Sequence, residues 1–186
     1  MKRNFGGKSL LYPMPALIIG SYDENNIPNA MVAAWGCVSD FDQVTIIIDA
    51  AHKTLKNILS RKAFTVSIAD AKHVVEVDYL GNISGHDEPN KVEKMNLHTE
   101  KSEFVDAPVF REFPVVLECE FVSFEDEPER LIGKVVNLGI EESILGENGK
   151  IDLTKFHPIV YDSHGHTYTT LGEQIGLAYE DYKKLQ

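Results

Sequence analysis

The sequence contains few cysteines and lacks any long hydrophobic run. Its 186 residues include two cysteines, Cys37 and Cys119, which are far apart and form no Cys-x-x-Cys motif. This usage argues against a disulfide scaffold and predicts a reducing, cytoplasmic location. The basic first residues are not followed by a long apolar stretch, so we expect neither a signal peptide nor a transmembrane segment.

Basic residues are also scarce. The chain has 18 Lys and Arg against 29 Asp and Glu, a formal net charge of -11, and the basic residues form no stripe. Nucleic-acid binding depends on neutralising phosphates with Lys and Arg, so this balance argues against nucleic acid as a partner. A local phosphate site is still compatible with it, because salt screens distant carboxylates over about 8 Å.

Several catalytic motifs are missing. The chain has no Gly-x-Gly-x-x-Gly dinucleotide motif, no P-loop and no Gly-x-Ser-x-Gly nucleophile turn. Cys37 has no basic neighbour to activate its thiol, and we expect it to be a small core residue. The clustered carboxylates, such as those of 125–127, are typical of a solvated surface. We therefore predict no catalytic side chain.

The histidines raise the question of a metal site. His164 and His166 flank a glycine, and His157 and Asp162 are close to them in sequence. The two rings could chelate a metal only if they pointed to one side of a strand, whereas this segment is expected to be a hairpin turn. We favour a solvated turn and predict no metal site.

The pattern of apolar segments predicts a mainly β protein, an antiparallel split β-barrel with a few inserted short helices, forming a single domain over residues 1–186. Cys119 alternates with carboxylates and is expected to face the core. We expect Asp70 to cap a helix that stops at Gly81. The expected strands are 17–22, 29–39, 44–49, 64–68, 115–124, 130–140, 159–161 and 167–170, and the expected helices are 54–60, 71–80 and 89–95.

The segment 50–58 is the most informative part of the chain. It follows a buried strand and begins an amphipathic helix, with Leu55 and Ile58 on its apolar face. The free N–H groups at a helix start favour a phosphate, to which Lys53 would add a charge and Thr54 a hydroxyl donor. The alternative is an ordinary turn with a solvated lysine.

A second polar segment, Ser84-Gly85-His86-Asp87, is followed by Lys91. A loop rich in Gly, Asn and Ser could bind a phosphate with its backbone amides. Taken alone, it is better explained as a surface connection.

The segment 29–37 is unusually rich in small residues for a strand, and it contains Trp35, the only tryptophan. Small side chains would let a flat aromatic ligand approach the backbone, with Trp35 covering it. Composition alone favours the alternative, in which Trp35 is a core anchor. Together with the two phosphate segments, this strand suggests a phosphorylated aromatic cofactor.

The order of these motifs resembles the flavin reductase-like, FMN-binding split-barrel family, and within it the flavoredoxin group. The resemblance covers nearly the whole chain. The matching segments are 12–15, 29–30, 35–39, 52–54 with 57–58, 81–85 with Lys91, 107–108, 117–119, 132–135 and 168–172.

This resemblance implies a homodimer with one FMN per subunit near the interface. Lys53, Thr54, Ser84, Gly85 and Lys91 would then hold the phosphate. The resemblance also assigns Asn29 and Trp35 to the ring system and ribityl chain, and Ser39 and His52 to the cofactor. Arg130, Tyr161 and Tyr168 would line the far side of the flavin from the partner subunit. Some relatives carry a longer histidine-bearing segment near Arg130, which this chain lacks.

The resemblance also implies function. It suggests an oxidoreductase that transfers hydride or electrons through bound flavin, an NAD(P)H-dependent flavin reductase. The alternative is a non-enzymatic electron carrier of the flavoredoxin type, which exchanges electrons with a redox protein. A barrel that binds another planar ligand, such as haem, is a third alternative.

Overall fold

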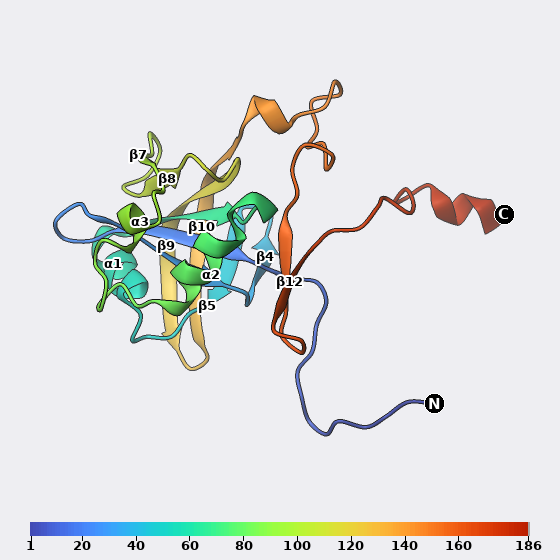
Figure 1. Ribbon diagram of the computed structural model, residues 1–186, viewed down its shortest axis with the longest axis horizontal. Helices are drawn as coiled ribbons and strands as arrows, with labels where there is room; N and C mark the ends of the chain where they lie inside the picture. The colour runs from blue at the N-terminus through green and yellow to red at the C-terminus, as the bar shows by residue number, and fades with distance from the viewer. Residues whose placement is uncertain (186) are drawn as a thin grey trace.

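A computed structural model describes residues 1–185, and a seven-stranded antiparallel sheet forms its body (Figure 1). The strand order in this sheet is β3-β2-β6-β9-β10-β5-β4. The strands are β1 (Met14–Pro15), β2 (Leu17–Tyr22), β3 (Pro28–Ala33), β4 (Gly36–Asp40), β5 (Gln43–Ile47), β6 (Ala63–Ile68), β7 (Thr99–Lys101), β8 (Pro108–Phe110), β9 (Val115–Asp126), β10 (Glu129–Ile140), β11 (Ile159–Asp162) and β12 (Thr167–Thr170). The α-helices are α1 (Lys53–Arg61), α2 (Val74–Asn82) and α3 (Lys91–Lys94), and short 3-10 turns cover Ala71–His73, Glu142–Ile144 and Asp181–Leu185.

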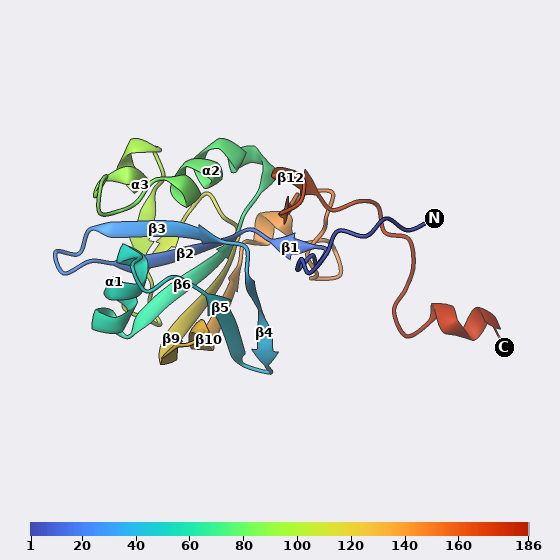
Figure 2. The ribbon, with the colours of Figure 1, turned by 90° about the horizontal axis from the view of Figure 1, so that it is seen from below.

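Two apolar cores lie on opposite faces of the sheet. Successive side chains of a strand point to opposite faces, so the neighbours Ile18 and Ile19 belong to different cores. Ile19 packs inside the curled sheet with Phe64 and with residues of α1. Ile18 packs outside it, beneath α2 and α3, which cover β2 and β3 (Figure 2). The helices are thereby fixed against one edge of the sheet.

The strand expected over 29–39 is in fact two strands, so this prediction is wrong. β3 and β4 lie at opposite edges of the seven-stranded sheet, and the chain turns between them at Ala34 and Trp35. Gly36 permits the turn, because a Cβ there would lie 2.7 Å from the Leu17 Cδ1 atom. The backbone N–H of Ile47 donates to the Trp35 carbonyl (2.8 Å), which ties this turn to β5.

The break in this strand corrects two burial expectations. Cys37 is exposed rather than part of the core, because β4 is an edge strand. Trp35 is 61% exposed in the single chain, so it is not a core anchor. Cys119 is buried, as predicted, and burial raises the pKa of its thiol to about 12. Its thiol therefore stays protonated and unreactive at neutral pH.

The second helix starts and ends differently from the prediction. Asp70 does cap a helical turn, since its carboxylate accepts the Lys72 backbone N–H (2.8 Å), but this turn is 3-10. Gly81 does not stop α2, which continues to Asn82. The third helix is shorter than expected and begins at Lys91 rather than at Pro89.

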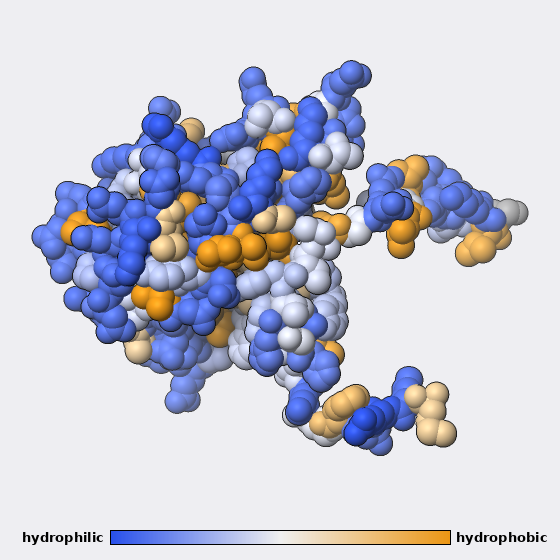
Figure 3. All heavy atoms as spheres, in the orientation of Figure 1, coloured by the Kyte–Doolittle hydropathy of each residue, from blue (hydrophilic) through white to orange (hydrophobic). Residues whose placement is uncertain are grey.

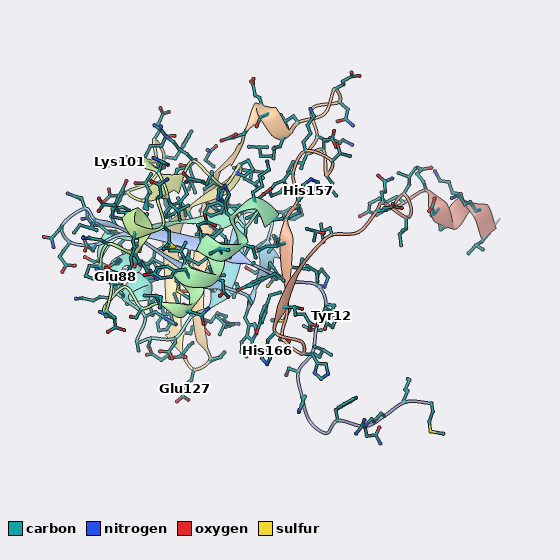
Figure 4. The ribbon with its side chains drawn as sticks, in the orientation of Figure 1. Tyr12, Glu88, Lys101, Glu127, His157 and His166 are labelled. Atoms are coloured by element: carbon teal, nitrogen blue, oxygen red, sulfur yellow. The ribbon has the colours of Figure 1, made fainter. Side chains whose placement is uncertain are left out.

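The final hairpin forms as predicted, but it does not join the barrel wall. β11 and β12 pair with β1 in a separate three-stranded sheet. His157 and His166 lie at opposite ends of this hairpin (Figure 4). Within residues 1–185, no three His, Cys, Asp or Glu side chains are placed to share a metal ion.

A glycine in β10 allows the tightest contact of the inner core. The register of β10 against β9 shifts between Ile132 and Gly133, and a Cβ at Gly133 would lie 2.2 Å from Phe64 Cζ. We expect Gly133→Ala to lower the free energy of unfolding by about 2 kcal/mol, because the buried Phe64 ring has no room to move away. Urea unfolding measures this loss, and Gly7→Ala, with no atom near its Cβ, should change nothing. Equal stability of the two variants would contradict the prediction.

Among the described residues, no helix has both the length and the apolar character needed to cross a membrane.

Candidate functional site

The two predicted phosphate segments line one groove. The start of α1 and the loop that follows α2 face each other across a cavity of about 370 Å³, with β3 as its floor. That volume is within the range typical of small-molecule sites. The lining residues are Met31, Val32, Asp49, Ala51, His52, Lys53, Thr54, Leu80, Gly81, Asn82, Ile83, Ser84, Gly85 and Lys91.

The start of α1 offers free backbone donors to this groove. His52 is the N-cap residue, its side chain makes no capping hydrogen bond, and the first turn of α1 contains no acidic residue. The first N–H groups of the helix therefore lack intrahelical acceptors, and the dipole is positive there. The exposed His52 and the partly buried Lys53 flank this end of the groove.

Lys53 is held in place by a carboxylate that the sequence reasoning missed. Its Nζ lies 3.2 Å from Asp23 Oδ2, and Asp23 is 3% exposed. Burial alone would raise the pKa of Asp23, but the N–H groups of Ile27 and Asn25 and the charge of Lys53 bring it below its usual value. The turn cluster at 23–26 was visible in the sequence, but nothing in it indicated a partner 30 residues away.

Thr54 and Asn29 form the buried floor of the groove beside the start of α1, the part that we call the anion end. The Asn29 Nδ2 donates to Thr54 Oγ1 (2.7 Å), and both side chains are almost fully buried. The Asn29 Oδ1 has no hydrogen-bond partner anywhere in residues 1–185. A buried acceptor without a donor is costly, so this atom is suited to a ligand hydroxyl.

Gly85 presses its backbone against this pair. A Cβ at Gly85 would lie 2.2 Å from Asn29 Oδ1 and 3.2 Å from Lys53 Cδ. Only a glycine can therefore bring the loop this close to β3 and α1. The neighbouring Ser84 is exposed, and its Oγ accepts the His86 N–H (3.1 Å), which leaves the hydroxyl proton free to donate.

Lys91 is buried behind the loop rather than extended into the groove. Its Nζ donates to the carbonyl oxygens of Leu80 (2.9 Å) and Ile83 (2.6 Å), and the residue is 2% exposed. An ammonium has three donors, so one remains for a ligand. Burial and the charge of Lys53 lower the pKa of Lys91 from 10.5 to about 8. The lysine fastens the end of α2 and thereby places Ser84 and Gly85.

The groove continues into a smaller hollow of about 160 Å³, which shares Val32, Gly81 and Asn82 with it. Tyr161 and Tyr168 of the final hairpin line this end, with ring centroids 5.7 Å apart. The Tyr168 hydroxyl donates to Asp78 Oδ1 (3.1 Å), and burial, with that carboxylate, raises its pKa to about 12. The site thus has an anion end and an aromatic end.

Three predicted residues lie outside the groove. Trp35 is next to Ala34, which lines the smaller hollow, but its own ring is exposed to solvent. Ser39 lies on β4, where its Oγ accepts the Thr45 hydroxyl (2.8 Å). Arg130 pairs with Glu125 on the neighbouring strand (2.5 Å). Their contact with a cofactor stays a prediction.

The comparisons with known proteins point to one family. The flavin reductase like domain matches residues 9–170. The structure of flavoredoxin from Desulfovibrio vulgaris (Miyazaki F) is similar at a TM-score of 0.93 and 31% identity, and the match covers 98% of this chain and 100% of that one.

Two further structures extend the likeness. Flavoredoxin from Methanosarcina acetivorans matches with a TM-score of 0.88 and 25% identity, and 100% of both chains is covered. A Shewanella frigidimarina protein with a split barrel domain matches with a TM-score of 0.74 and 18% identity, over 89% of this chain and 86% of that one. At that identity it shows the fold alone, which is the split barrel predicted from the sequence. The chain belongs to the flavin reductase-like domain family.

Proposed function

We propose that the chain binds FMN in the groove and transfers hydride or electrons through it. The observation that carries this proposal is the meeting of the α1 start, Asn29 and Gly85 around one buried anion end. The phosphate would lie against the free N–H groups of α1, the Thr54 hydroxyl and Ser84, with the charges of Lys53 and Lys91 beside it.

The residues present fit such a group. The partnerless Asn29 Oδ1 is placed to accept a ribityl hydroxyl, and Gly85 keeps the anion end open where any side chain would fill it. Val32, Gly81 and the tyrosine pair supply a flat apolar surface toward the other end. FMN supplies the hydride and electron chemistry when bound, and the chain's own side chains bind and orient it.

The electron donor separates two functions. As an NAD(P)H-dependent flavin reductase, the protein would take hydride from a reduced nicotinamide, and the family it belongs to supports this activity. A flavoredoxin-type carrier would instead receive electrons from a redox protein, and the 31% identity to the Desulfovibrio flavoredoxin favours this second candidate. In both cases we propose a homodimer in the cytoplasm. The two free cysteines are consistent with that location.

The absorption spectrum of the purified protein tests the proposal first. A flavin absorption spectrum supports it if the compound that heating releases from the protein is FMN. A haem spectrum, or a colourless protein that takes up no added FMN, would overturn it. Steady-state oxidation of NADH and NADPH then separates the two candidates. Turnover with either nicotinamide identifies a reductase, and tight flavin without turnover identifies a carrier.

The low pKa of Lys91 makes a pH dependence of FMN affinity expected. In the empty site half of the Lys91 amines are uncharged near pH 8. A bound phosphate favours the charged amine and raises this pKa, so binding takes up a proton at higher pH. The dissociation constant for FMN should therefore rise above about pH 8, by up to about tenfold per pH unit. The phosphate itself is already a dianion there, since its second pKa is about 6.

Calorimetric titrations at pH values from about 7 to 9 measure this effect. Riboflavin, which has no phosphate, should show a flat profile with the wild-type protein. Lys91→Met should flatten the profile for FMN as well. A wild-type affinity for FMN that does not change over this range would contradict the prediction.

A further inference from the structure

Lys91 is the one buried lysine among residues 1–185. The face of the molecule seen in Figure 3 is largely hydrophilic, and every other lysine of the described residues is exposed or partly exposed. Lys91 is only 2% exposed, although it lines the groove. Its amine is therefore shielded from bulk water but can be reached by a small molecule that enters the groove.

The hydrogen bonds of Lys91 match an uncharged amine. A neutral amine has two N–H groups, and the carbonyl oxygens of Leu80 (2.9 Å) and Ile83 (2.6 Å) both accept from its Nζ. The remaining position of the nitrogen is then its lone pair. This lone pair is the group with which an amine attacks carbon, and the groove is where a reactant can meet it.

Burial also favours the uncharged amine. No carboxylate of the described residues pairs with Lys91, and a buried ammonium without a counterion is costly. Asp49, His52 and Lys53 line the groove with it, and of these only Lys53 contributes to the shift. Desolvation, followed by the charge of Lys53, lowers the pKa of Lys91 to about 8, so about one amine in ten is neutral at pH 7. Desolvation beside a second cation is a general way to obtain a nucleophilic lysine.

Lys94, on the same short helix, provides the contrast. It is exposed, and its Nζ lies 2.8 Å from Glu88 Oε2. The hydrogen bond to this carboxylate raises the pKa of Lys94, so its amine is almost entirely charged at pH 7. The helix α3 thus carries one amine suited to nucleophilic attack and one that stays a cation.

The facing wall of the groove selects what reaches the amine. The free N–H groups of α1, the Thr54 hydroxyl and the charge of Lys53 favour a phosphate. A nucleophilic amine needs an electrophilic carbon beside that phosphate. In an acyl phosphate the carbonyl carbon is bonded to a phosphate oxygen, so one small molecule suits both walls.

We infer that the groove binds small acyl phosphates and that Lys91 takes their acyl group, which closes the site to FMN. The acyl transfer depends on the groove and on the amine alone. The closing of the site rests on the proposed FMN binding as well.

The transfer needs no further reactant. The lone pair of the neutral Lys91 amine attacks the carbonyl carbon, a C–N bond forms, and the C–O bond to the phosphate breaks. The phosphate leaves with that electron pair, and the N–H groups of α1 and the charge of Lys53 stabilise it. One of the two amine protons passes to the departing phosphate, and the other remains on the amide nitrogen.

Acylation removes what Lys91 contributes to the site. The amide keeps one N–H for two carbonyls, so Leu80 or Ile83 loses its donor. The positive charge beside the anion end disappears, and the acyl group occupies space in the groove. Lys91 is therefore a modification site through which an acyl phosphate regulates the binding of FMN.

Incubation of the FMN-free, full-length protein with acetyl phosphate at pH 7 tests the inference, with peptide mass spectrometry reading the acetylation rate at each lysine. We expect Lys91 to react at least about tenfold faster than Lys94, because far more of its amine is neutral. The rate at Lys91 should saturate with acetyl phosphate, and inorganic phosphate should slow it without affecting Lys94. Equal rates at the two lysines, or no protection by phosphate, would overturn the inference.

Two comparisons separate the binding of the phosphate from the reactivity of the amine. N-hydroxysuccinimidyl acetate acetylates amines but carries no phosphate, so it should prefer Lys91 over Lys94 less strongly than acetyl phosphate does. Lys53→Met should slow the acetylation of Lys91 by acetyl phosphate at least about tenfold. The matched control Lys56→Met, which removes the same charge from an exposed position of α1, should leave it unchanged. The same preference with both reagents, or the same rate in both variants, contradicts a phosphate-directed reaction.

Absorbance titration with FMN reads the closing of the site separately. The protein acetylated at Lys91 should bind FMN at least about tenfold more weakly than the unmodified protein. Lys94→Gln removes a charge from the same helix outside the groove and should bind FMN as the wild type does. Unchanged affinity after acetylation of Lys91 overturns the closing of the site. A wild-type protein that is acetylated at Lys91 but binds no FMN would count only against the proposed function.

Discussion

Replacing Lys53 with Met and Thr54 with Val together is expected to weaken FMN binding by about 100-fold or more. In the proposed site each change would remove a hydrogen bond or charge contact to the phosphate, and such contacts contribute about 1.5–3 kcal/mol each. Both replacements keep the approximate shape of the side chain, so α1 should remain packed on the barrel. Calorimetric titration of the purified apoprotein with FMN measures the change.

Riboflavin makes the readout specific to the phosphate. The wild-type protein should prefer FMN to riboflavin strongly, and the double variant should lose most of that preference. The matched control is Lys56→Met, which removes the same charge from an exposed position of the same helix, outside the groove. If the double variant is folded by circular dichroism and binds FMN within about threefold of the wild type, the anion end is assigned wrongly.

Gly85→Ala is expected to have the second largest effect, at least a tenfold loss of FMN affinity. The added methyl would lie 2.2 Å from Asn29 Oδ1, so either the loop or the Asn29 amide must move. Overpacking at such a buried contact costs about 1–3 kcal/mol, and the displacement would also break the bond from Asn29 to Thr54. Equilibrium titration and thermal melting together report both effects.

A double-mutant cycle identifies the cause. In an Asn29→Ala background the clash is gone, so adding Gly85→Ala should cost little further affinity. Additive losses in the cycle would mean that Gly85 acts through its own backbone conformation, and the contact with Asn29 would then be irrelevant.

The local elements of the fold could be predicted from the sequence, because each has a strong local pattern. The strand 17–22, the helix after 52 and the final hairpin all form within a residue or two of the expected positions. Cys119 faces the core, as its alternation with Glu118 and Glu120 predicted. These features depend on side-chain periodicity and turn residues, which a short window of sequence contains.

The errors occur where a distant partner decides the local structure. The segment 29–39 has the composition of one strand, but the closure of the sheet divides it between opposite edges. Gly81 has the properties of a helix stop, yet Lys91 binds the carbonyls of Leu80 and Ile83 and lets α2 continue past it. Neither outcome could be read from the neighbouring residues alone.

The candidate site shows the same division. Its polar segments at 52–54 and 84–85 were recognisable because helix starts and Gly-Ser loops have known preferences for anions. Residues that only orient the site, such as Asp23 beneath Lys53, were missed because a buried ion pair across 30 residues leaves no local trace.

Chain composition and periodicity were enough to predict a mainly β protein and two segments suited to a phosphate, because these properties depend on neighbours in the chain. Folding in three dimensions decided that the two segments share one groove and that Lys91 fastens the loop from behind. Those arrangements depend on how a curled sheet brings its edges together, which no local pattern of residues encodes.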